Sequence, residues 1–148
     1  MKKIDFHVEY IDEGEESLIL RIRPENEKMA EEIKEMLGEE TRMIGMCGPE
    51  KILFSLRDVF YFEYMEGKVF AYFRDSTCSV SSSLEKIEQQ VERYDFLRCS
   101  KSMILNMKYI DKFQSTIGNR IIATLSNGEN VIISRNYAKR LRAFLKDE

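Results

Sequence analysis

Lysine and arginine side chains concentrate in the C-terminal third of this 148-residue chain. Residues 96–148 hold 10 Lys and Arg against 4 Asp and Glu, whereas residues 1–46 hold 7 against 13, and the whole chain carries a net charge of -3. Ammonium groups bind phosphates, and a guanidinium can also bond O6 and N7 of a guanine together. The gradient is the electrostatic footprint expected of a DNA reader, and its other interpretation is an ordinary solvated surface.

Residue combinations typical of catalysis do not occur in the sequence. The single histidine, His7, stands in a segment with strand periodicity, far from any Cys or Ser motif, and we interpret it as structural. The sequence has no Gly-rich phosphate loop, Cys-x-x-Cys pair or His-Glu-x-x-His helix, and the carboxylates between residues 25 and 40 have the spacing of a solvated helix face. We therefore expect no enzymatic activity, no metal and no cofactor.

The three cysteines, Cys47, Cys78 and Cys99, are odd in number and lack metal-ligand spacing. We interpret them as buried or incidental thiols, in agreement with a reducing compartment. The sequence has no apolar run near the roughly 20 residues of a membrane-spanning helix, and no apolar segment follows Lys2 and Lys3 as in a secretory signal. We expect a cytoplasmic protein without membrane insertion.

Residues 1–46 have the pattern of a small β-β-α segment. Apolar and polar residues alternate over residues 4–10 and again over 18–22, the period of half-buried strands. After Pro24, apolar residues recur at helical spacing from Met29 to Leu37. The segment is too short for a phosphorylatable receiver domain, so we expect a small extension that dimerises or packs on the main domain.

Residues 47–148 have the pattern of a mostly β (α+β) domain, and the Gly- and Pro-containing stretch 45–49 marks its boundary. The predicted strands lie near residues 51–56, 59–63, 68–74, 77–81, 97–105, 109–116, 120–125 and 130–134.

Helix and turn signals punctuate these strands. Ser82 and Glu85 have the spacing of a capping box at the start of a helix, and a terminal helix begins near Asn136. Gly118-Asn119 and Asn127-Gly128 predict tight hairpins, because both residue types tolerate positive φ.

The signature of a known family is recognisable in Phe96-Leu97-Arg98-Cys99-Ser100-Lys101-Ser102, followed by apolar residues and Asn106. This stretch resembles the LytTR family of bacterial DNA-binding domains, and the resemblance extends over about residues 47–145. The run 58–63 ending in Phe-Glu, the helix before the signature, and Asn127-Gly128 followed by residues 131–137 all agree in order. The resemblance implies an elongated, mostly β fold with short helices that places loop residues into successive major grooves of DNA.

The resemblance also implies which residues contact DNA. Lys101 matches a base- or phosphate-contacting position, Arg135 matches a contacting Arg before the last helix, and Lys68 lies in the loop of a third contact region. Ser102 matches a serine whose hydroxyl could bond a phosphate. The other candidates are Arg98, Asn106 and Asn136. For Asn106 we favour the shaping of a turn by bonds to local backbone, and for the basic residues the alternative is a solvated or capping side chain.

Two residues carry particular weight. Arg135 is the best candidate for specificity, because Arg can read a guanine bidentately whereas Lys suits phosphates or a single acceptor. Ser100 stands where the family usually has His, so any contact made by that imidazole is lost in this chain.

Together these features predict a cytoplasmic bacterial transcription regulator that binds double-stranded DNA without catalysis. One small module seldom buries enough surface for tight operator binding, so we expect a homodimer on repeated half-sites. The alternative is a LytTR-fold protein-interaction or ligand-sensing module without DNA binding, suggested by Ser100 and the acidic first third. The sequence leaves open the operator, the regulatory input and any regulatory protein partner.

Overall fold

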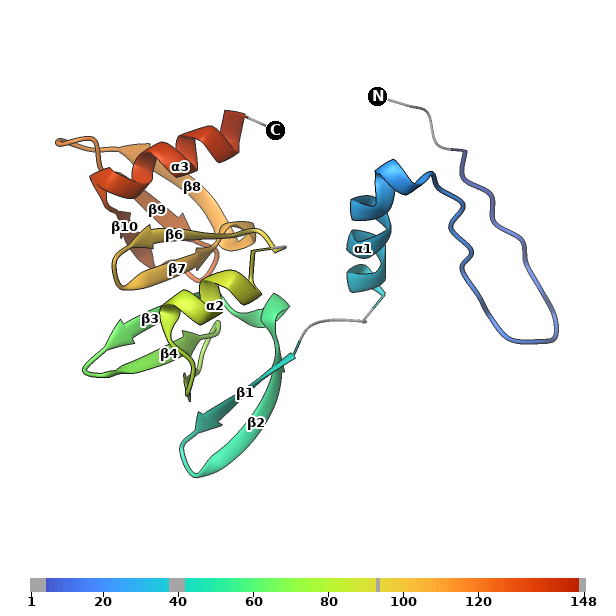
Figure 1. Cartoon of the computed structure of the whole chain (residues 1–148), viewed down its shortest axis with the longest axis horizontal. Helices are drawn as coiled ribbons and strands as arrows, with labels where there is room; N and C mark the ends of the chain where they lie inside the picture. Colours follow the sequence, from blue (N-terminus) through green and yellow to red (C-terminus); the bar gives the residue numbers. More distant parts are fainter. Residues whose placement is uncertain (1–4, 38–41, 93, 147–148) are drawn as a thin grey trace. The chain divides into compact units, whose positions relative to one another are not determined.

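The computed structural model describes residues 5–37, 42–92 and 94–146. The chain divides into two compact units, Met1–Glu39 and Glu40–Glu148 (Figure 1). This division precedes the boundary expected after residue 46, because strand β1 (Arg42–Cys47) pairs with strands of the C-terminal unit. The pairing of β1 with β5 joins residues distant in sequence, Met46 and Ser79, and the local composition around residue 46 does not encode it.

Residues 5–37 of the N-terminal unit form one α-helix and a long irregular stretch. The 3-10 turn η1 (Pro24–Asn26) leads into helix α1 (Glu27–Met36), where the sequence predicts a helix. Residues 5–23 form neither helix nor strand, so the two strands of the expected β-β-α segment are not formed by the described residues. Phe6 and Tyr10 are 83% and 92% exposed, and His7 is exposed as well. An isolated hairpin with no surface to cover is marginal in water, which accounts for the difference.

The C-terminal unit is built on two antiparallel sheets, in agreement with the expected mostly β fold. Among the described residues, the large sheet has the strand order β2-β1-β5-β4-β3-β7-β6 and the small sheet has the order β10-β9-β8. Besides β1, the strands are β2 (Glu50–Ser55), β3 (Tyr61–Met65), β4 (Lys68–Tyr72), β5 (Thr77–Val80), β6 (Phe96–Ser100), β7 (Met103–Asn106), β8 (Ile110–Ser115), β9 (Ile121–Leu125) and β10 (Asn130–Ile133). The single strand predicted over 97–105 is therefore a hairpin, β6–β7.

The described residues of this unit also form two helices and two 3-10 turns: α2 (Leu84–Gln90), α3 (Arg135–Lys146), η2 (Leu56–Asp58) and η3 (Met107–Tyr109). The cap of α2 is Ser83, whose Oγ accepts a hydrogen bond from the backbone N of Lys86 at 3.3 Å, one residue after the expected Ser82. In the described parts of the chain no helix is long and apolar enough to cross a membrane.

Alternate residues of the central strands supply two cores on opposite faces of the large sheet. Phe62 lies in one core, beneath Ile87 of α2. Its neighbour Tyr61 lies in the other, together with Leu125 of β9 and Leu141 of α3. Side chains alternate between faces with a period of two along a strand, and each fully buried aliphatic side chain contributes about 1.5–3 kcal/mol. The result is a layered unit in which the large sheet lies between α2 and the small sheet with α3.

Tight turns set the register of the hairpins where the sequence predicts them. Gly118 and Asn119, between β8 and β9, both have positive φ, at +83° and +61°. In the β9–β10 turn, Gly128 has a φ of +89° and the Asn127 side chain accepts a hydrogen bond from the backbone N of Glu129. Both expected hairpins are confirmed.

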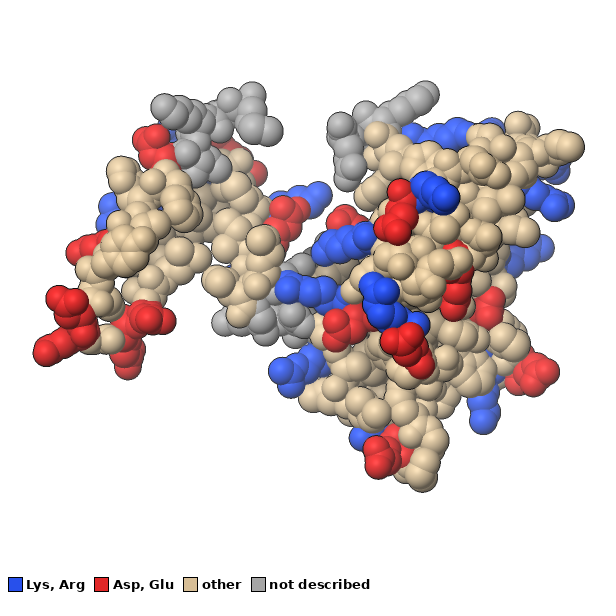
Figure 2. All heavy atoms as spheres, turned by 180° about the vertical axis from the view of Figure 1, so that it is seen from behind, with Lys and Arg blue, Asp and Glu red and all other residues tan. Residues whose placement is uncertain are grey.

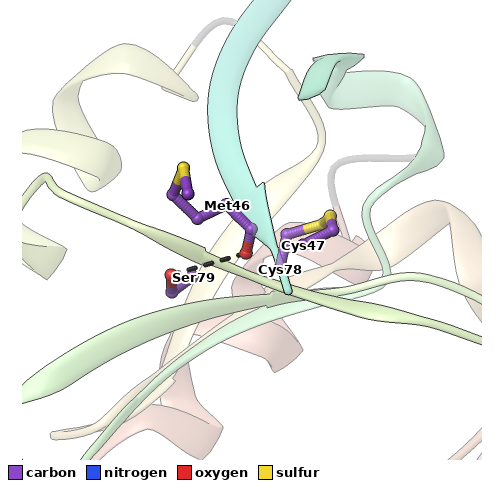
Figure 3. The surroundings of a disulfide bond; sticks show 4 residues. All are labelled: Met46, Cys47, Cys78 and Ser79. Carbon is purple, nitrogen blue, oxygen red and sulfur yellow. Dashed lines mark hydrogen bonds between the residues drawn. A yellow bond between two sulfur atoms is a disulfide. The ribbon is translucent and has the colours of Figure 1, made fainter. Parts of the chain in front are cut away.

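A disulfide joins β1 to β5 and overturns the expectation of three thiols. Cys47 and Cys78 lie on neighbouring strands with their Cα atoms 4.4 Å apart (Figure 3). A Cβ built on the adjacent Gly45 would meet the Phe54 ring at 2.9 Å and Cys78 Cβ at 3.1 Å, so glycine permits this close approach. Cys99 stays a buried thiol, as expected, and burial raises its pKa to about 12. The bond also removes the argument from cysteines for a reducing compartment.

Candidate nucleic-acid interface

Three exposed lysines from separate elements line one groove of about 850 Å³. Lys51 comes from β2, Lys68 from the start of β4 and Lys101 from the turn between β6 and β7. We call this depression the lysine groove. Its polar lining also includes Ser79, Ser81, Ser82, Ser83 and Glu85, and its apolar lining includes Ile44, Met46, Tyr64, Val69 and Leu84. The structure thus brings two predicted contact residues, Lys68 and Lys101, together with a lysine that the sequence analysis did not select.

A tight turn projects Lys68 from the protein. Met65 and Lys68 are paired across the β3–β4 hairpin, and the two residues between them, Glu66 and Gly67, have φ values of +51° and +83°. Positive φ at both central residues defines the turn type whose twist matches a two-residue hairpin. The lysine therefore occupies the first position of β4, beside the hairpin tip.

Arg98 holds the β6–β7 turn that carries Lys101. Its guanidinium donates from Nε to the backbone O of Ser100 at 2.9 Å and from Nη2 to the backbone O of Lys101. Nη1 pairs with Glu88 Oε2 on α2 at 2.8 Å, and the arginine side chain is only 11% exposed. Three of the five N–H groups of the guanidinium are bonded within the protein, so the geometry gives Arg98 a positioning role, and its contact with DNA stays a prediction.

Two serines complete the same turn. The backbone N of Ser102 donates to Ser100 Oγ at 3.2 Å, and the two hydroxyls lie 3.3 Å apart. The backbone O of Ser102 accepts a bond from the backbone N of Tyr64 at 2.8 Å, which ties the turn to β3. Ser100, the departure from the family signature, thus acts locally as a turn former, and Ser102 lies beside Lys101.

Asn106 is buried inside the unit and does not reach the surface. It is 2% exposed; its Nδ2 donates to the backbone O of Val59 at 2.9 Å and its Oδ1 accepts from the backbone N of Lys108 at 3.1 Å. The expected contact of Asn106 with DNA is wrong, because the side chain is buried and both ends of its amide are bonded within the protein. The interpretation as a turn-shaping residue is confirmed.

A second basic depression, of about 650 Å³, surrounds the start of α3. It is lined by Ser134, Arg135 and Asn136, together with Arg120 and its neighbours Ile117 and Gly118 from the β8–β9 turn. We call it the arginine pocket. Arg135 and Asn136 are the first two residues of α3 and are exposed. Arg120 was missed because its only signal in the sequence is its place just after the Gly118-Asn119 turn.

A backbone hydrogen bond connects the two basic sites. The N of Ser134, which precedes Arg135, donates to the O of Cys99 on β6 at 3.0 Å. Cys99 is two residues before Lys101, and Arg98 beside it anchors the same turn. The positions of Arg135 and Lys101 are therefore fixed relative to one another by the fold.

Surface charge on the C-terminal unit is mixed. Figure 2 shows Lys and Arg side chains projecting all round this unit in that view, with acidic side chains between them, and not one continuous basic patch. A uniform positive field favours any duplex, whereas separate cationic points favour a particular docking geometry. The arrangement suits a protein that places a few cations at defined points.

Comparisons with known proteins identify the family of this chain. Residues 50–146 match the family described as the LytTr DNA-binding domain. The sensory transduction protein LytT of Bacillus subtilis is 28% identical over 98 residues, which cover 66% of this chain and 41% of that protein. The LytT protein of Enterococcus faecalis is 24% identical over 132 residues, which cover 86% of this chain and 54% of that protein. The chain thus spans about half or less of the length of these curated relatives.

A solved structure has the same fold. A LytTr DNA-binding domain from Bacillus cereus superposes with a TM-score of 0.67 at 24% identity, covering 73% of this chain and 98% of that domain. The family match extends over well over half of the chain and includes the three lysines of the lysine groove and all the residues that line the arginine pocket. This chain belongs to the LytTR family of DNA-binding domain proteins.

Proposed function

We propose that this protein is a sequence-specific transcription regulator that reads the major grooves of double-stranded DNA with turn residues and catalyses no reaction. The observation that carries the proposal is the pair of basic sites, the lysine groove and the arginine pocket, held together through the Ser134–Cys99 bond. Cations at fixed separation on a rigid sheet framework suit a regular array of phosphates and base edges.

The two sites have different chemistry. Lys68 and Lys101 are mobile point charges, suited to phosphate oxygens or a single base acceptor. Arg135 offers a planar fork of donors for O6 and N7 of a guanine, with Asn136 beside it as a further donor and acceptor. We assign discrimination mainly to Arg135, and affinity to the lysines with Ser102 in support.

The N-terminal unit supports assembly of two copies. Its described residues leave several large apolar side chains exposed, among them Phe6, Tyr10, Leu18, Ile19 and Met36. Exposed apolar groups at this density mark interaction surfaces. We propose that the N-terminal unit, Met1–Glu39, joins two chains, so that two domains bind repeated half-sites on the bacterial chromosome, in the cytoplasm.

The same exposed surface favours a second candidate function, that of a protein-interaction module on a LytTR fold. The two functions separate on heparin, a polyanion. Retention that falls with salt and is lost in the double variant Lys101→Ala/Arg135→Ala supports the DNA surface, whereas weak retention unchanged by these substitutions supports the interaction module.

The decisive experiment is selection of bound duplexes from a random pool, followed by titration of the selected and a scrambled duplex at two salt concentrations. We expect an enriched repeated motif, bound at least about 10³-fold more tightly than the scramble. Arg135→Ala should lower this ratio by about tenfold or more. Selection without enrichment, with only weak salt-sensitive binding, would contradict the proposal.

A further inference from the structure

Lys51 is the lysine of the groove for which the sequence predicts no role. It lies on β2, in the β1–β2 hairpin, whereas Lys68 and Lys101 come from the turns expected to contact DNA. We propose that the β1–β2 hairpin is a further DNA-contacting element, in which Lys51 with Ser81 and Ser82 binds backbone phosphates of one DNA strand along the lysine groove. This inference rests on the proposed function and adds a contact surface to it.

The charge of the groove is the first argument. Within the described ranges, Lys51, Lys68 and Lys101 form no ion pair, and Glu85 is the acidic residue of the lining. Three unpaired ammonium groups around one depression favour an anionic ligand there. A polyanion such as DNA also releases counterions when it binds such groups.

The serines that line the groove together with the lysines are the second argument. Ser83 Oγ is occupied as the cap of α2, and Ser79 Oγ donates to the backbone O of Met46 at 3.5 Å. The hydroxyls of Ser81 and Ser82 bond no other residue in the part of the chain that the structure describes. Serine hydroxyls are common donors to phosphate oxygens, so this wall of the groove complements the three cations.

The support of the hairpin is the third argument. Lys51 is paired with Met46, and Met46 is paired in turn with Ser79 of β5. Figure 3 shows the Cys47–Cys78 disulfide and the Ser79–Met46 hydrogen bond side by side on this junction. The lysine therefore projects from a strand clamped to the sheet, which lowers the entropy lost when it binds.

The chemistry predicts contact without discrimination. A lysine ammonium on a phosphate neutralises one charge and carries no information about the base. Loss of Lys51 should therefore weaken binding to every duplex by the same factor, in contrast to loss of Arg135.

The test compares Lys51→Ala with Lys112→Ala, which removes an exposed lysine from β8 outside the groove. Dissociation constants are measured for the selected operator and its scramble from about 50 mM to about 200 mM salt. We expect Lys51→Ala to weaken both duplexes about 3- to 10-fold and to reduce the salt slope by about 0.9, with their ratio unchanged. Lys112→Ala should leave the affinities, the salt slope and the operator-to-scramble ratio as in the wild type.

A second variant and a modified duplex make the assignment specific. Ser81→Ala/Ser82→Ala should weaken both duplexes in the same uniform way. Methylphosphonate linkages neutralise single phosphates of the duplex. At one or two positions in the DNA, such a linkage should weaken binding by the wild type and leave binding by Lys51→Ala unchanged. Wild-type slope and affinity in Lys51→Ala, or a changed operator-to-scramble ratio, overturn this inference alone. A wild-type protein that binds no duplex overturns the proposed function with it.

Discussion

Single side chains in the signature segment divide into those that face outward and those that hold the turn. Lys101 is exposed, whereas Arg98 and Asn106 have their polar groups bonded within the protein. The sequence alone could not separate these roles, because an arginine or an amide binds DNA and backbone carbonyls with the same donors. Burial and partner geometry decide, and both depend on contacts such as Arg98 with Glu88 that join separate elements.

Arg98 provides a test of the positioning role. Lysine cannot bond Glu88 and two carbonyls with one ammonium in the planar arrangement of a guanidinium, so Arg98→Lys keeps the charge and loses the geometry. We expect Arg98→Lys to lower the operator-to-scramble ratio about tenfold, nearly as much as Arg98→Ala. Binding titrations on both duplexes measure this ratio. If Arg98→Lys has the operator-to-scramble ratio of the wild type, only the charge of residue 98 contributes to discrimination.

Glu88 supplies the matched control for that experiment. Glu88→Gln removes a negative charge, which by charge alone should strengthen binding to any duplex. If Glu88 acts through Arg98, the substitution should instead lower discrimination. An increase in affinity for both duplexes with an unchanged ratio contradicts the positioning role.

Among the elements, those defined by local signals were predicted well. The hairpin turns at Gly118-Asn119 and Asn127-Gly128 carry their own conformational preference, and the strands near them have period-two patterns. The split of residues 97–105 was missed because the turn at Lys101 contains neither Gly nor Pro and is held by Arg98. The Cys47–Cys78 bond was missed because it depends on β1 lying next to β5, a pairing across 31 residues.

That bond should stabilise the C-terminal unit. Cross-linking residues 31 positions apart restricts the unfolded chain and contributes about 3.7 kcal/mol. We expect Cys47→Ser/Cys78→Ser to lower the free energy of unfolding by this amount relative to the oxidised wild type, as measured by urea denaturation. A reductant should lower the wild-type value and leave that of the double variant unchanged. An equal response of both proteins to the reductant contradicts the assignment.

The two units of the chain differ in the kind of information that specifies them. Residues 40–148 contain strong strand, turn and signature patterns and fold around two cores. Residues 5–23 carry an equally clear alternation but form no strand among the described residues. Alternation specifies which side chains need burial without naming the surface that buries them. The alternation in this segment therefore predicts that its apolar side chains contact a partner. It does not predict the secondary structure of the segment.

The partner that we propose for this segment is a second copy of the chain, since the proposed function places two domains on repeated half-sites. We expect the full chain to sediment as a dimer and Phe6→Ser/Tyr10→Ser to shift it to a monomer, because both side chains are almost fully exposed when the segment is unpaired. Affinity for a two-site operator should fall by about 10²-fold, while affinity for a single half-site stays unchanged. Analytical ultracentrifugation and titrations on one-site and two-site duplexes measure these quantities.

Ile132→Ser controls for the general loss of an exposed apolar group, because Ile132 is 58% exposed on β10 in the other unit. It should keep both the dimer and the two-site affinity. If Phe6→Ser/Tyr10→Ser is still a dimer, the dimer interface lies in the C-terminal unit. If the wild type is monomeric both free and on the two-site duplex, the proposed dimer is wrong. The affinity for DNA would then have to come from one domain. Since the C-terminal unit offers two basic sites on one framework, that outcome predicts a single asymmetric site instead of a repeat.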